Sequence, residues 1–228
     1  MTDDFKKNII DSYPKHIDTV GDIIQTVYDR VYLREDLHTK WYNSDDIRNG
    51  TFQLYLSTLY NEKTKIFLLQ KFISSDDFVN QYFSFIMPRT NKENLKPILL
   101  MLYNLDCDLR FDFFLKFYSQ FESFIRLIYR KFNLKKEPFK SVFKKLSIEG
   151  DNFLVKIDTI RNSVHNGGLH MPLERHEQKV EYDSCNSKYI LEAGDPILLG
   201  WEETFDTIKE FIDYTFRIVE TDLISQDI

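Results

Sequence analysis

Large apolar residues recur at helical spacing between residues 109 and 132, and this pattern constrains the fold most strongly. Steps of three and four residues place them on one broad face of an α-helix: Phe114, Phe117, Phe121, Phe124 and Ile128. The chain of 228 residues holds 20 Phe and 13 Tyr but a single alanine, Ala193. Large side chains must therefore fill the helix faces, which predicts a thick core rich in aromatic contacts.

Helical spacing also occurs earlier in the chain, at residues 17–33 and 52–72. Between Pro88 and Pro97 this pattern is interrupted. We therefore expect a helical N-terminal region of unknown role at residues 1–95, followed by a second helical domain at residues 96–228.

After the 109–132 helix, the sequence predicts a short helix over residues 138–146 and another that begins near Asp151 or Asn152, either of which could cap it. Asn166-Gly-Gly is typical of a helix end. Alternation around residues 179–192, with a turn at residues 183–187, indicates a small hairpin. A final helix starts at Trp201. The expected fold class is all-α, a helical bundle with a small β-hairpin before the last helix.

Charge and composition exclude several classes of protein. The formal net charge of −6 argues against a protein that coats nucleic acid through its overall field. The two cysteines, Cys107 and Cys185, form neither a disulfide framework nor a zinc-ligand spacing. The first residues lack the apolar run of a signal peptide, and no stretch resembles a membrane span. We expect a soluble, cytoplasmic protein without a membrane partner.

The helix that begins near Asp151 carries two stripes. The apolar stripe consists of Phe153, Ile157, Ile160 and Val164. The polar stripe gathers on another face at the last turns of the helix, and it consists of Asp158, Arg161, Asn162 and His165. A guanidinium matches a phosphate and stays charged, while an imidazole can transfer a proton near neutral pH. This pairing indicates a phosphate-directed acid–base site.

The run Ile160-Arg-Asn-Ser-Val-His-Asn-Gly-Gly resembles the signature helix end of HEPN domains. The stretch from Phe117 to Arg126 is similar to the long early helix of that family, and the hairpin and the Trp-led last helix follow in the same order. The resemblance covers residues 97–228. It implies a compact helical bundle, and many members are metal-independent ribonucleases of toxin–antitoxin, CRISPR and phage-defence systems whose active site is assembled across a dimer.

On this resemblance, His165 would act as acid or base when a ribose 2′-hydroxyl attacks the adjacent phosphate. Arg161 would stabilise the developing charge, Asn162 would orient the phosphate or His165, and Asp158 would hold Arg161. No metal and no other cofactor are expected. The expected partners are RNA, a second copy of the chain, and a regulatory or antitoxin protein.

Two alternatives stay open. Only three residues separate Arg161 from His165, which is shorter than the family's usual nuclease spacing and favours a catalytically inactive HEPN-like module that binds RNA or a protein. Asn162, directly after Arg161, favours the nuclease. On a purely structural interpretation, Arg161 would pair with Asp158 on the surface and His165 would cap helix carbonyls. Whether the chain is an enzyme is therefore open at this point.

A basic run could supply RNA-binding side chains beside the motif, although a solvated helix face is at least as good an interpretation. The candidate RNA-binding residues are Arg126, Arg130, Lys131, Lys135, Lys136 and Lys140. Two further histidines, His170 and His176, follow the motif without a metal-ligand spacing, and we interpret them as surface residues.

Overall fold

The computed structural model describes residues 2–42, 46–75, 81, 96–135, 137–166, 168–171, 179–197 and 199–221. Within these ranges the description omits the side chains of residues 2–6, 8, 9, 96–99 and 165. The described elements are seven helices and one antiparallel hairpin: α1 (Thr2–Tyr32), α2 (Glu35–His38), α3 (Ile47–Ser74), α5 (Lys96–Lys131), α6 (Pro138–Lys145), α7 (Asp151–His165), β1 (Lys179–Ser184), β2 (Ser187–Glu192) and α8 (Trp201–Val219). The expected all-α fold with a hairpin before the last helix is confirmed.

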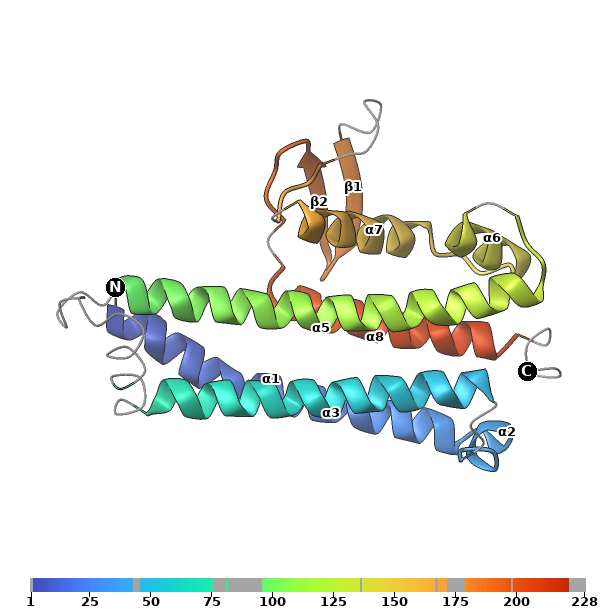
Figure 1. Ribbon diagram of the computed structural model, residues 1–228, viewed down its shortest axis with the longest axis horizontal. Helices are drawn as coiled ribbons and strands as arrows, with labels where there is room; N and C mark the ends of the chain where they lie inside the picture. Colours follow the sequence, from blue (N-terminus) through green and yellow to red (C-terminus); the bar gives the residue numbers. More distant parts are fainter. Residues whose placement is uncertain are drawn as a thin grey trace.

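The four long helices α1, α3, α5 and α8 run lengthwise through the molecule (Figure 1). Helix α3 packs on α1 and on α5, and α8 packs on α5 and on α1. The shorter elements α6, α7 and the hairpin lie on the far side of α5 from α1 and α3 (Figure 1). The motif helix α7 therefore sits on the outside of the bundle, supported by α5 from below.

Aromatic side chains form the centre of the core, as the composition predicts. Phe211 of α8 is fully buried, and its ring lies within 6.5 Å of five other aromatic rings, measured between centroids. These five rings come from α5 and α7: Phe114, Phe117, Tyr118, Phe121 and Phe153. Edge-to-face and offset contacts of this kind stabilise a core beyond the area they bury.

The N-terminal helices share this core. Tyr55 of α3 stacks on Phe117, and its hydroxyl hydrogen-bonds the hydroxyl of Thr215 in α8 at 2.9 Å. A second junction is polar, because the Asp106 carboxylate in α5 accepts hydrogen bonds from Tyr13 of α1 at 2.8 Å and from Trp201 of α8 at 2.9 Å. The predicted division at residues 95 and 96 stays a prediction, since residues 82–95 lie outside the described part.

A buried ion pair lies at the N-terminal end of α3. The Asp46 side chain caps the helix by accepting from the backbone N–H of Arg48 at 2.9 Å. The same carboxylate binds the Arg48 guanidinium at 2.7 Å, and both side chains are only 1% exposed. Asp36 approaches the other side of that guanidinium at 2.8 Å. These contacts hold the pKa of the Asp46 carboxyl below its usual range, against the opposing effect of burial.

Several boundaries differ from the sequence expectation. Helix α1 begins at Thr2 rather than near residue 17 and contains Pro14. Helix α5 begins at Lys96, well before Leu109, with Pro97 in its first turn, where a proline costs no hydrogen bond. The expected side-chain cap of α7 was wrong, because Gly150 occupies the N-cap position and no side chain caps the helix.

The hairpin is confirmed, with a tighter turn than expected. Ser184 pairs with Ser187, so only Cys185 and Asn186 form the turn. Their φ angles are +49° and +60°, as a two-residue type I′ turn requires. Asn152 of α7 ties the hairpin down: its amide group donates to the carbonyl of Asp183 at 3.1 Å, and its oxygen accepts from the Asp183 backbone N–H at 2.7 Å.

Candidate phosphate-binding helix end and adjoining groove

The predicted apolar stripe orients α7 on the bundle. Phe153, Ile157 and Ile160 are buried, and Val164 is half-buried. Phe153 packs edge-on against Phe121 of α5, with ring centroids 5.7 Å apart. Burial of this face turns the polar stripe toward the outside of the molecule.

A buried lysine on the apolar side of α7, which the sequence analysis missed, holds this helix against α8. The side chain of Lys156 is 0% exposed. Its ammonium lies 3.2 Å from the Asp206 carboxylate and also pairs with Glu210, both in α8, and it reaches the Ser184 hydroxyl of the hairpin at 3.5 Å. Burial raises the pKa of Glu210, and the Lys156 ammonium opposes that rise.

Arg161 is half-buried on the outward side of α7. Its Nη1 donates to the Oδ1 of Asn162 at 3.1 Å, and its guanidinium carbon lies 6.0 Å from the centroid of the Tyr118 ring. Among the described residues, no carboxylate lies within ion-pair distance of this guanidinium. The cation is thus oriented by an amide and an aromatic ring, and no carboxylate among the described residues neutralises it.

Asp158, which the motif resemblance assigned to hold Arg161, contacts a different residue. The Tyr118 hydroxyl approaches its Oδ1 at 3.5 Å, a long hydrogen bond. The nearby protein raises the pKa of the Asp158 carboxyl by desolvation, and the positive charge of Arg161 opposes this rise. Arg161 therefore acts on Asp158 through space, and the surface ion pair of the structural interpretation is not formed in the described structure.

The helix ends as Asn166-Gly-Gly predicts. His165 is the last residue of α7, and Gly168 has a φ of +85° and donates its backbone N–H to the carbonyl of Ser163 at 2.8 Å. Since the side chain of His165 lies outside the described residues, its part in the site stays a prediction. Its backbone position places it one helical turn beyond Arg161.

The basic run is split between two helices. In α5, Arg126 pairs with Glu122 at 2.7 Å, while Arg130 and Lys131 are exposed at its C-terminal end. Lys135 is exposed in the connection, and Lys136 lies outside the described residues. Lys140 of α6 pairs with Glu137 at 3.3 Å. Of the six candidate RNA-binding residues, Lys140 is the one that lines the pocket beside α7 in the described structure.

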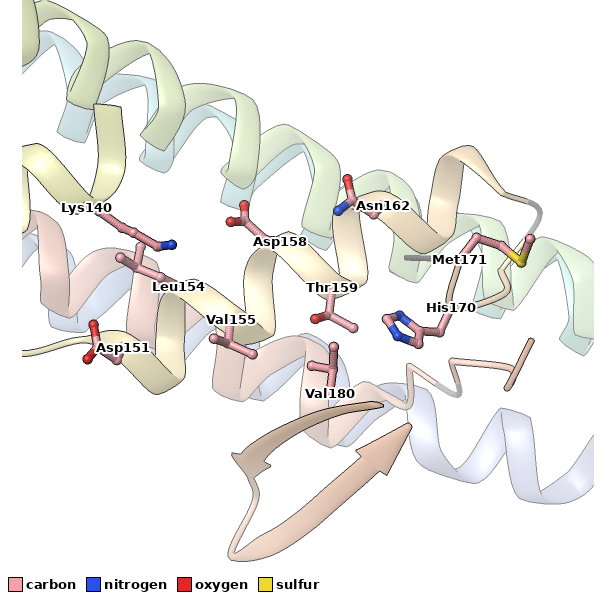
Figure 2. A pocket seen from close by; sticks show the side chains of 10 residues that line it. All are labelled: Lys140, Asp151, Leu154, Val155, Asp158, Thr159, Asn162, His170, Met171 and Val180. Carbon is pink, nitrogen blue, oxygen red and sulfur yellow. The ribbon is translucent and has the colours of Figure 1, made fainter. Parts of the chain in front are cut away.

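That pocket is a groove with a volume of about 640 Å³ along the outward face of α7 (Figure 2). Helix α7 forms one wall, Val180 of β1 and Met171 form part of the other, and Lys140 stands at one end. The lining residues are Lys140, Asp151, Leu154, Val155, Asp158, Thr159, Asn162, His170, Met171 and Val180. The groove thus reaches two of the predicted motif residues, Asp158 and Asn162.

His170 corrects the sequence interpretation, which placed it on the surface. It is only 5% exposed and lines the groove opposite Thr159 (Figure 2). Its backbone N–H donates to the carbonyl of Asp195 and its carbonyl accepts from Gly194, both at 2.8 Å. This burial depends on contacts with residues more than twenty positions away, which local spacing does not reveal. His176 lies outside the described residues.

Comparisons of the chain with protein-family models, curated proteins and solved structures find no match. No helix in the described part of the chain is both long and apolar enough to cross a lipid bilayer. The described residues also bring together no group of three or more His, Cys, Asp or Glu side chains that could hold a metal ion.

Proposed function

We propose that the chain is a HEPN-like endoribonuclease, of a toxin or phage-defence type, that cleaves RNA at the C-terminal end of α7 without a metal ion. RNA is the proposed substrate, a second copy of the chain the proposed partner, and the cytoplasm the proposed location. A regulatory or antitoxin protein would restrain the activity.

The state of Arg161 carries this proposal. Its guanidinium is oriented by Asn162 and Tyr118, yet no carboxylate of the described residues neutralises it. A guanidinium used only for structure would normally be paired with an acid or bonded to backbone carbonyls, as Arg48 is paired with Asp46. A fixed, half-exposed fork of donors instead suits a phosphate, which can accept two parallel hydrogen bonds.

The proposed reaction is an internal transfer at phosphorus. The ribose 2′-oxygen forms a bond to phosphorus while the bond from phosphorus to the 5′-oxygen breaks, which leaves a 2′,3′-cyclic phosphate and a 5′-hydroxyl. One proton leaves the 2′-hydroxyl and one joins the departing 5′-oxygen. His165 performs one of these transfers, and His165 of a second copy, facing it across a two-fold axis, performs the other. Arg161 stabilises the charge that develops on the phosphate.

The test compares variants on a labelled single-stranded RNA in excess EDTA. Arg161→Ala should weaken binding of all sequences alike and reduce the slope of log affinity against log salt by about 1. His165→Ala should keep binding and abolish cleavage. Arg217→Ala is the matched control, because Arg217 also lies over a tyrosine ring, at 5.0 Å from Tyr214, but on α8.

Cleavage that needs a divalent ion, or that survives in His165→Ala, would contradict the mechanism. Light scattering on the same samples tests the dimer, and a monomer at micromolar concentration would contradict the two-histidine arrangement.

A second function is a catalytically inactive module that binds RNA or a protein through the same face. The short spacing from Arg161 to His165 favours it, as does the hydrogen bond that already engages the Asn162 oxygen. Binding that depends on Arg161 in a wild-type protein without cleavage would support this function over the nuclease.

A further inference from the structure

The groove beside α7 combines apolar walls with a few polar groups at defined places. Val155 of α7 lies toward Val180 of the hairpin, and Leu154 adds an apolar side chain near Lys140 (Figure 2). Thr159 and Asn162 add polar side chains along the same helix wall. Such a surface suits a flat ligand whose faces are apolar and whose edge carries hydrogen-bonding groups.

His170 at one end of the groove holds an unsatisfied polar atom. Its Nε2 is buried and has no hydrogen-bond partner among the described residues. Buried polar atoms in proteins are almost always paired, so this one requires an explanation. The backbone of the residue is held by hydrogen bonds to Gly194 and Asp195, and its ring lies beside Thr159 in the groove (Figure 2). A ligand edge at this end of the groove would supply the hydrogen-bond partner that Nε2 lacks.

The charges of the lining residues determine which parts of a ligand can lie inside the groove. Its described lining contains two carboxylates, Asp151 and Asp158, and a single Lys or Arg side chain, that of Lys140. A phosphate in the middle would meet the Asp158 carboxylate and is disfavoured, while Asp151 lies at the Lys140 end (Figure 2). A neutral group with N–H donors is favoured, because the Asp158 carboxylate accepts hydrogen bonds. Phosphates fit at the margins, near Lys140 and near Arg161, which adjoins the groove through Asn162.

We propose that the groove binds an unpaired RNA base that carries an exocyclic amino group, with the base edge directed at Asp158 and His170. This inference rests on the proposed function, which supplies RNA as the ligand. Adenine, cytosine and guanine have the amino group, and uracil lacks it. Unpaired bases in RNA are commonly recognised in this manner, splayed out and hydrogen-bonded along their edges. The groove thereby sets which nucleotide stands beside the phosphate at Arg161.

The experiment measures the affinity of short A, C and U homo-oligonucleotides by fluorescence anisotropy. Wild-type protein should bind the A and C oligomers about tenfold more tightly than the U oligomer, within the range known for a good base contact. Asp158→Asn and His170→Gln should each reduce that preference, measured as the ratio of the A or C affinity to the U affinity. Loss of the Asp158 charge near Arg161 changes the affinity of all three oligomers alike and therefore leaves this ratio to report on the base contact. Asp108→Asn, an exposed aspartate on α5, is the control and should keep the preference.

Arg161→Ala distinguishes the two proposals, because it should weaken all three oligomers alike. Equal wild-type affinities, or a preference that both groove variants retain, would overturn the base site while binding through Arg161 still stands. A groove that serves a protein segment would give that same result.

Ligand-observed NMR with AMP, CMP and UMP covers the remaining outcomes. Contacts to AMP and CMP that disappear in Asp158→Asn, without any affinity for the oligomers, would refute the RNA function and leave a free-nucleotide site. No contact and no oligomer binding would refute both. Thermal melts confirm folding, and Asp158→Asn keeps the base site testable if His170→Gln unfolds.

Discussion

Replacement of Lys156 by methionine should loosen the docking of α7 onto α8. Methionine retains most of the side-chain length but leaves Asp206 and Glu210 without their shared cation. Removing one partner of a fully buried ion pair costs about 3–5 kcal/mol. Here the two carboxylates are 38% and 29% exposed, so water relieves part of the cost. We expect a loss of about 2–3 kcal/mol in the free energy of unfolding.

For a chain of this size, that loss lowers the melting temperature by about 4–12 °C, which circular dichroism resolves easily. Lys188→Met is the matched control, since Lys188 also pairs with a carboxylate, that of Glu181 at 2.6 Å, but on the exposed hairpin. The control should melt with the wild type, as exposed pairs contribute little. Equal melting of both lysine variants and the wild type would refute the structural importance of the buried cation.

The pH dependence gives a second check. The folded-state pKa of Glu210 is already raised by burial, and loss of the Lys156 charge raises it further. The folded state then binds a proton more readily than the unfolded state, so stability rises as the pH falls toward that pKa. The deficit of Lys156→Met should therefore shrink on going from pH 7 to pH 5. A stability deficit that grows over this range would contradict a raised pKa of Glu210 in the variant.

Two further predictions concern the N-terminal helices. Burial lowers the pKa of His16 to about 4, so the unfolded chain binds more protons between its ordinary value of about 6.5 and about 4, and stability should fall as the pH falls through that window. His16→Phe should flatten this part of the stability profile, measured by denaturant titration at several pH values. Asp46→Asn should cost about 3 kcal/mol, because it weakens the cap of α3 and leaves Arg48 buried with one partner fewer. Asp36→Asn, at a carboxylate that is 37% exposed, should cost clearly less, and a reversed order in thermal melts would contradict the argument from burial.

Periodicity predicted α7 well because its apolar stripe is local. Lys156 occupies that same face, three residues after Phe153 and four before Ile160, and its position could have signalled burial. A lysine is by itself expected to face solvent, since lysine is almost never buried unless it is paired. The carboxylates that pair with it, Asp206 and Glu210, follow 50 and 54 residues later in α8, and no local pattern connects them.

The start of α1 was missed for a related reason. Pro14 signals a helix boundary, yet α1 runs through it from Thr2, and Tyr13 beside it is fully buried and bonded to Asp106 of α5. Tertiary contact thus outweighs the local preference. His170 belongs to the same class of error, because its burial is imposed by the segment after the hairpin.

The two bonds between Asn152 and the backbone of Asp183 have a consequence for how the molecule opens. An isolated two-stranded hairpin is marginal in water, so this one depends on its attachment to α7. Local unfolding should release both walls of the groove together, as one cooperative unit. Exchange of the Asp183 amide hydrogen, which is bonded to the Asn152 side chain, would then report on the opening of this unit.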